Sequence, residues 1–240
     1  MQLRWKAALS SLAFTISATQ AVAGVCEAPF MHDGGVAQLQ GSGGMQLGAD
    51  LSFSEVTHQG KDACKARVQG VATYGLAGLP PGKSSLDYWM SVKDGNATFQ
   101  RRNEQGGRES VDGKFDLRML GLFAYGEPIT RAGQTFPPLR FQINLDKKAV
   151  ETAPIVIETG DKTVGERQTI ATAAGQQSCW PIQYTRRTAP TQASFSGLVL
   201  PIPATTSSVT DWFCPALNMV MKQESNQNGV VSTVEVTKLQ

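Results

Sequence analysis

The residues of this sequence with the clearest potential chemistry are its cysteines. An even number of cysteines in a chain exported to an oxidising compartment is typical of disulfide bonds. No CxxC spacing occurs and the sequence has two histidines, so a zinc site is disfavoured. Three pairings are possible, and we favour the sequential one, first with second and third with fourth, because each bond then ties one end of the chain. The four cysteines are Cys26, Cys64, Cys179 and Cys214.

No motif in the sequence predicts catalysis. The segment Gly78–Ser84 is similar to a phosphate-binding loop, but three residues separate its glycines where four are needed, and Pro80 and Pro81 lack the amide donors. A Ser-His-Asp triad would have to use His32 or His58. We therefore expect a protein without enzymatic activity and without a cofactor or metal ion.

The N-terminus has the pattern of an export signal. Arg4 and Lys6 precede an apolar stretch that is too short to span a membrane, and a small-residue cleavage site ends at Ala23. Val25, directly before Cys26, disfavours lipidation of that cysteine. We expect a signal peptide at 1–23, followed by one β-rich exported domain at 24–240, in the periplasm or secreted.

Composition and charge exclude several classes of partner. The chain has 240 residues, with 22 Lys and Arg against 20 Asp and Glu. Removal of 1–23 takes away two positive charges, so the remaining chain is formally neutral. Attraction to nucleic acid or to an anionic membrane has no support from this balance, and no later stretch is long and apolar enough to cross a bilayer.

The local pattern is one of short strands between turn residues. Asp94-Gly95 favours a two-residue hairpin turn that sets Val92 opposite Ala97, while Trp89 falls on the polar face of that hairpin. Asn228-Gly229 predicts a second hairpin near the C-terminus. With eight to twelve strands and little helical periodicity, we expect an all-β fold, a meander of antiparallel strands in a curved sheet around an apolar interior. Further strands are expected at 45–56, 64–74, 139–145, 155–159, 166–173 and 179–185.

Three segments resist a simple strand assignment. The stretch 34–48 contains many glycines and is predicted to be a flexible loop. The stretch 188–208 is rich in Pro, Thr and Ser around a short apolar run. The stretch 114–125 is interpreted as a strand followed by a turn, with a short helix as the alternative.

Two segments of the second half resemble a family of bacterial exported β domains of unknown function. The first is 164–182, a strand, an Ala-Gly turn and a second strand that begins with Cys179 and Trp180; the second is 212–222, which begins with Trp-Phe-Cys-Pro. The resemblance covers about 150–240 and implies a half-barrel like that of periplasmic lipoprotein carriers. Ala216 and Asn218 stand where the family usually has glycine. The family carries no established activity, so no catalytic residue follows from it.

Two functions of different classes fit these observations. The first is a periplasmic binding protein that holds a hydrophobic or lipid-like ligand on the concave face of the sheet. The alternative is an envelope interaction module, without a small ligand, that docks to a larger assembly through its edge strands. We expect a monomer in either case. The aromatic and sulfur side chains fill a core in the simpler interpretation and line a ligand site in the other; the candidates are Trp89, Trp180, Tyr184, Trp212 and Met219.

Overall fold

The structure is a computed structural model of the chain. Its described residues are 25–43, 46–60, 63–75, 82–93, 96–103, 105–110, 125, 129–143, 151–152, 155–195 and 198–240. The expected signal peptide 1–23 and most of 114–125 lie outside them. No helix in the described part of the chain has the length and apolar character needed to cross a bilayer.

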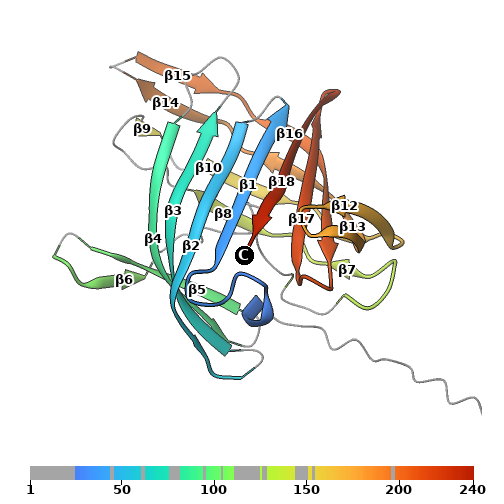
Figure 1. Ribbon diagram of the computed structural model, residues 1–240. Helices are drawn as coiled ribbons and strands as arrows, with labels where there is room; N and C mark the ends of the chain where they lie inside the picture. Colours follow the sequence, from blue (N-terminus) through green and yellow to red (C-terminus); the bar gives the residue numbers. More distant parts are fainter. Residues whose placement is uncertain are drawn as a thin grey trace, which may run out of the picture.

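One large antiparallel sheet contains most of the strands, and a separate sheet of three strands accompanies it (Figure 1). The large sheet runs in the order β6-β5-β4-β3-β2-β1-β18-β17-β16-β13-β10-β8; β11 and β12 also pair with β13, and β7 pairs with β11. In its first half the strands are β1 Val36–Gly43, β2 Gln46–His58, β3 Ala63–Gly75, β4 Gly82–Lys93, β5 Asn96–Arg102, β6 Arg108–Ser110, β7 Thr135–Phe136 and β8 Arg140–Ile143. In its second half they are β10 Ile155–Thr159, β11 Lys162–Val164, β12 Gln168–Thr172, β13 Gly175–Thr188, β16 Thr205–Cys214, β17 Met219–Gln227 and β18 Val230–Leu239. The small sheet has β9 Glu151–Thr152, β14 Thr191–Phe195 and β15 Leu198–Ile202.

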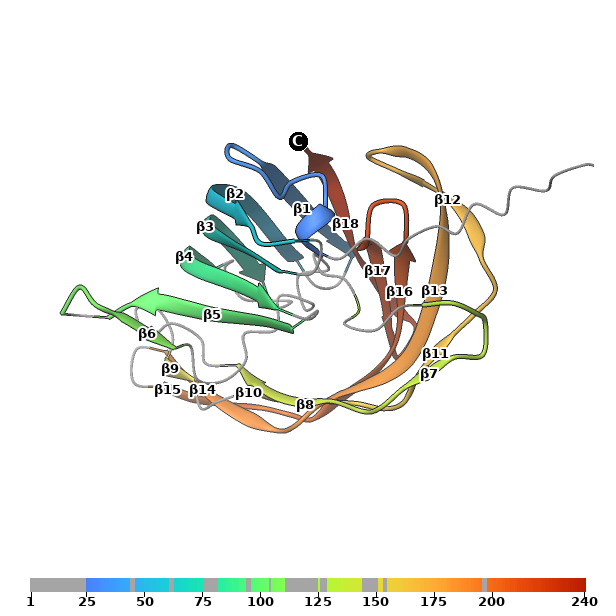
Figure 2. The ribbon, with the colours of Figure 1, turned by 90° about the horizontal axis from the view of Figure 1, so that it is seen from below.

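The large sheet curves strongly and is not closed. Figure 2 shows β1–β5 on one side of the curve and β8, β10 and β13 on the other, with the short 3-10 helix η1 (Val25–Glu27) inside. Among the described strands, β6 and β8 end the order and no pairing joins them. This curved antiparallel sheet confirms the predicted fold class.

The concave face carries the main hydrophobic core. Register partners share a face of a sheet, so the rows of paired residues show which side chains point inward. We call the larger group of buried side chains the first core cluster; its members come from η1, β1–β4, β17 and β18 and from both disulfides. They include Phe30, Leu39, Leu51, Phe53, Val68, Met90, Met219, Met221 and Val236.

The register of β4 and β5 agrees with the hairpin expected from the sequence. Val92 pairs with Ala97, Met90 with Phe99, and Trp89 with Gln100. The turn dipeptide itself lies outside the described residues.

The glycine-rich segment 34–48 is not a flexible loop, so this prediction was wrong. Its described residues from Val36 onward form β1 and the start of β2, and Gly41 allows these two strands to approach closely. A Cβ atom at Gly41 would lie 2.3 Å from the carbonyl oxygen of Leu47, so this position in the curved ribbon requires glycine. A glycine that is a loop signal in the sequence is therefore needed here for the close approach of two strands.

The segment 188–208 also contains strands, and the expected total of eight to twelve was too low. β14 and β15 form a hairpin in the small sheet, and β16 begins at Thr205. Threonine has a high β propensity, and Pro201 is tolerated because β15 is an edge strand. The described residues alone form eighteen strands.

The turn residues of the C-terminal half behave as their types predict. Asn228 and Gly229 both have positive φ, at 53° and 86°, as a type I′ hairpin turn requires. Asn218, in the turn between β16 and β17, has a φ of 50°. Asparagine tolerates this left-handed region better than most residues, which explains how it can stand where the resembling family has glycine.

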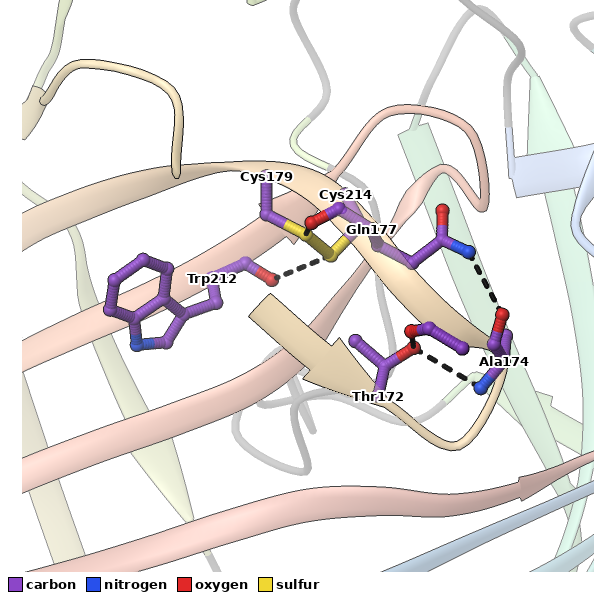
Figure 3. Close-up of a disulfide and its surroundings, with 7 residues drawn as sticks. Thr172, Ala174, Gln177, Cys179, Trp212 and Cys214 are labelled. Atoms are coloured by element: carbon purple, nitrogen blue, oxygen red, sulfur yellow. Dashed lines mark hydrogen bonds between the residues drawn. A yellow bond between two sulfur atoms is a disulfide. The ribbon is translucent and has the colours of Figure 1, made fainter. Parts of the chain in front are cut away.

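The two disulfides have the sequential connectivity that the sequence predicted. Cys26 bonds to Cys64 and ties η1 to β3, while Cys179 bonds to Cys214 and joins the neighbouring strands β13 and β16 (Figure 3). The figure also shows the turn between β12 and β13, where the Gln177 amide donates to the carbonyl of Ala174 at 2.9 Å. All four cysteine side chains are buried.

Candidate functional site

The candidate site lies on the concave face of the C-terminal strands. One row of paired residues runs across β13, β16, β17 and β18 as Ile182, Asp211, Gln223 and Val234. The first and last of these are apolar core residues, and the middle two are polar. The pattern places an acid and an amide in a face that is otherwise used to bury apolar side chains.

Asp211 is the centre of a buried hydrogen-bonded group. Its side chain is 5% exposed; Gln223 donates to Oδ1 at 2.8 Å, and the hydroxyl of Tyr125 donates to Oδ2 at 2.5 Å. The hydroxyl of Tyr184 lies 3.4 Å from Oδ1, and Arg186 donates to the Gln223 side-chain oxygen at 3.3 Å. Charge-assisted hydrogen bonds of this kind offset the cost of removing a carboxylate from water.

Lys162 adds a buried ammonium group to the same place. It is also 5% exposed, and its Nζ lies 5.1 Å from the ring centre of Tyr125 and 4.7 Å from that of Tyr184. Both distances are within the range of cation–π attraction. We call Asp211, Lys162, Tyr125, Tyr184, Gln223 and Arg186 the Asp211 cluster.

The second core cluster packs beside the Asp211 cluster. Tyr125 belongs to both clusters. Its hydroxyl donates a hydrogen bond to Asp211, while its ring packs edge-on against Phe213, with 6.0 Å between the ring centres. Apolar and polar groups therefore meet at one place on the concave face. The members of the second core cluster are Tyr125, Ile129, Phe136, Val164, Trp180, Ile182, Phe213 and Val220.

Two of the five candidate lining residues lie at this place. Tyr184 is half-buried in the Asp211 cluster, and Trp180 is buried in the second core cluster with the guanidinium of Arg167 4.5 Å from its ring centre. The indole Nε1 of Trp180 is buried without a hydrogen-bond partner in the described part of the structure. The structure therefore brings these two aromatics to one region.

The other three candidates lie elsewhere. Met219 is fully buried in the first core cluster. Trp212 is on the opposite face of β16 from Asp211 and Phe213, where its indole donates to Glu224 at 3.3 Å. The pKa of the Glu224 carboxyl is lowered, chiefly by a hydrogen bond from Lys222 and also by this bond from Trp212. These positions do not form one lining surface with Tyr184.

Trp89 lies on the outer face of β4, between the core residues Tyr88 and Met90. Arg67 is its register partner on β3, and the guanidinium groups of Arg67, Arg102 and Arg108 lie 5.2, 5.7 and 4.1 Å from the centre of its ring. This tryptophan is half-buried, with three guanidinium groups around its ring.

Asp211 and Lys162 are not among the candidate residues expected from the sequence. Alternation in β16 gives Val209, Asp211 and Phe213 the same inward direction, so an acid between two apolar residues was a readable signal. Lys162 had no comparable signal, because β11 has three residues and its pairing with β7 and β13 is visible only in the folded chain.

The chain is similar in fold to three solved bacterial structures. One, from Bacteroides fragilis, is described as exported with a YmcC-like fold; it is 10% identical, with a TM-score of 0.48 over 87% of this chain and 96% of that one. A second, from Parabacteroides distasonis and described as a lipoprotein, is 12% identical, with a TM-score of 0.47 over 89% and 98%. The third is the hypothetical lipoprotein YmcC from Escherichia coli, 10% identical, with a TM-score of 0.37 over 88% and 86%. No protein-family model and no curated protein matches the chain.

Proposed function

We propose that the chain is an exported binding protein that holds a hydrophobic or lipid-like ligand on the concave face of its curved sheet. The observation that carries this proposal is the Asp211 cluster, a buried carboxylate and a buried ammonium set among apolar side chains. Burying charged groups is costly, and a polar group retained inside an apolar face can serve recognition. The ligand would place its polar group near the cluster and its apolar part along the face.

The contact surface for this ligand is the next row of the concave face. That row pairs Tyr184, Val209, Ser225 and Ser232 across β13, β16, β17 and β18. Val209 is buried, while the tyrosine and the two serines are half-buried, so this row is more accessible than the row of Asp211. An aromatic side chain beside small residues suits an apolar chain with a polar end.

Export is consistent with the disulfides. Two bonds between buried cysteines are typical of chains that fold outside the reducing cytosol. The chain resembles bacterial exported β domains in its second half, and it is expected to lose 1–23 on export.

A fluorescent fatty acid such as 11-dansylaminoundecanoic acid tests the proposal directly. We expect a saturable increase of dansyl fluorescence with the purified protein. Replacing Tyr184 with Ala should weaken binding about fivefold or more, because burial of an aromatic ring against a ligand is worth roughly 1 kcal/mol or more. The matched control is Gln183→Ala, which changes the neighbouring, exposed residue on the other face of β13.

Absence of saturable binding by the unaltered protein would overturn the proposal. So would equal losses in the two variants, because the effect would then not depend on the concave face. Unfolding curves of both variants establish that each retains the fold.

A specific observation favours the alternative of an envelope interaction module. β15 pairs only with β14 among the described strands, so its other edge is open, and Val199 in it is 56% exposed. An open apolar edge can accept a strand from another protein. A photo-crosslinker at Val199 that captures the same envelope protein in cells, and does not do so from the exposed Thr206 of β16, would support this function.

A further inference from the structure

The outer face of the N-terminal strands carries an unusual arrangement of like charges. Arg102 on β5 and Arg108 on β6 are register partners, so two cations stand directly opposite each other across a strand pair. Such pairs are destabilising in a sheet unless something compensates them. Both side chains are exposed and both approach the ring of Trp89.

The third arginine at this ring makes direct ion pairs, whereas Arg102 acts on the Asp87 carboxylate only through its charge, from beyond ion-pair distance. Arg67 donates to both carboxylate oxygens of Asp87, at 2.9 and 3.0 Å, and lies 3.4 Å from Glu55. A bulge in β2, where Glu55 has a φ of 54°, accompanies this contact. For Arg102 and Arg108 no carboxylate lies within ion-pair distance in the described part of the chain.

Trp89 supplies a second, independent sign of an incomplete site. Its Nε1 is buried and has no hydrogen-bond partner among the described residues. A buried donor of this kind normally finds an acceptor. The guanidinium groups of Arg102 and Arg108 lie 5.7 and 4.1 Å from the ring centre, within the range of cation–π attraction, so the ring keeps both cations close together.

We propose that Trp89, Arg102 and Arg108 form an oxyanion-binding site on the outer face of the sheet. The ligand group is a phosphate or a similar tetrahedral oxyanion, carried by a small solute or by a lipid headgroup. Two guanidinium groups would donate to its oxygens, and its negative charge would offset the repulsion between them. This site lies on the face opposite to the Asp211 cluster, and the inference stands whether or not the concave face binds a ligand.

Inorganic phosphate is the first probe, titrated by calorimetry at constant ionic strength with chloride as the balancing anion. We expect saturable binding by the unaltered protein. Replacing Arg108 with Gln should weaken it about tenfold or more, because the variant loses a charge-assisted hydrogen bond to the anion. The matched control is Lys93→Gln, which removes one exposed charge from the end of β4 and is not part of the proposed site.

Thermal unfolding separates ligand binding from a structural role of the arginine. Without phosphate, Arg108→Gln should melt no lower than Lys93→Gln, because it relieves repulsion. With phosphate, the unaltered protein and the control should rise in Tm, whereas Arg108→Gln should not. An equal phosphate-dependent rise in all three proteins, or no saturable binding by the unaltered protein, would overturn the proposal.

Vesicles distinguish the two sources of the oxyanion. Co-sedimentation with phosphatidylglycerol in phosphatidylcholine that is lost in Arg108→Gln would identify a lipid headgroup. Binding of phosphate without co-sedimentation would identify a free solute.

Discussion

The two halves of the sheet use their inner and outer faces in opposite ways. In β1–β4 the inner face is apolar, with Leu51 and Phe53 buried, and the polar and aromatic chemistry around Trp89 is outside. In β13, β16 and β17 the inner face contains Asp211 and Gln223. The same alternation of residues thus builds a core on one side of the curve and a polar cluster on the other.

This difference separates stability from recognition along the chain. The inner face of the N-terminal strands consists mainly of buried or partly buried apolar side chains, so changes there act on packing. The C-terminal strands bury hydrogen-bonded charged groups, so changes there act on charge and on the geometry of donors and acceptors. The two disulfides differ in what they join, because Cys26 ties η1 to β3 whereas Cys179 links two strands that are already paired, and all four cysteines belong to the first core cluster.

The largest expected effect comes from removing one disulfide at a time. The cysteines are 38 and 35 residues apart in sequence, so chain entropy predicts a loss of about 4 kcal/mol of unfolding free energy for either pair. Urea unfolding of Cys26→Ser/Cys64→Ser and of Cys179→Ser/Cys214→Ser measures both. Because the entropic losses are matched, any difference between the variants reports on the folded state.

We expect that difference to appear in proteolysis. Loss of the first bond frees η1 from β3 and should expose the N-terminal segment to cleavage, whereas β13 and β16 remain paired along their length without the second bond. Equal resistance of the two variants would show that η1 is held by packing alone.

Much of the fold could be predicted from local sequence, and the failures have a physical reason. The hairpin register of β4 and β5 follows from alternation and one turn dipeptide. β1 could not be predicted, because Gly41 is a loop signal in isolation and a requirement of close strand approach only next to Leu47. Whether Gly41 belongs to a loop or to a strand depends on its contact with Leu47, and this contact exists only in the folded sheet.

The candidate site was less predictable than the fold. Aromatic type alone selected Trp89, Trp180 and Trp212 together, although Trp89 and Trp212 lie on the outer face and Trp180 lies inside. The Asp211 cluster depends on Tyr125 and Lys162, which come from distant parts of the chain. Contacts of this range are set by the curvature of the whole sheet.

A smaller effect is expected in the polar half. Replacing Asp211 with Asn keeps the size of the side chain but removes its charge and gives the Tyr125 and Gln223 donors a weaker partner. We expect a loss of about 1 to 3 kcal/mol of unfolding free energy. Asp50→Asn is the control, since Asp50 is an exposed residue of β2, and it should change stability by less than about 0.5 kcal/mol. Equal effects would mean that the buried network does not stabilise the fold.

The smallest expected effect is a dependence on acid pH at the outer face. The hydrogen bond from Arg67 lowers the pKa of the Asp87 carboxyl below its usual value of 3.8, and the charges of Arg67 and Arg102 lower it further. A carboxyl with a lowered folded-state pKa stabilises the fold above its unfolded pKa, and this contribution is lost as the pH falls through the folded value. The stability difference between the unaltered protein and Asp87→Asn should therefore be constant from pH 7 to about pH 5, begin to shrink near the unfolded pKa of about 3.9, and be lost as the pH falls through the lower folded pKa. Its size should stay below about 1 kcal/mol, because the pair is partly exposed.

Urea unfolding across this pH range measures the difference, and Glu224→Gln provides the comparison in the other half, where Lys222 lowers the pKa of the carboxyl. A difference that grows as the pH falls would contradict the assigned direction and would mean that the arginines at Trp89 do not hold Asp87 in its charged form.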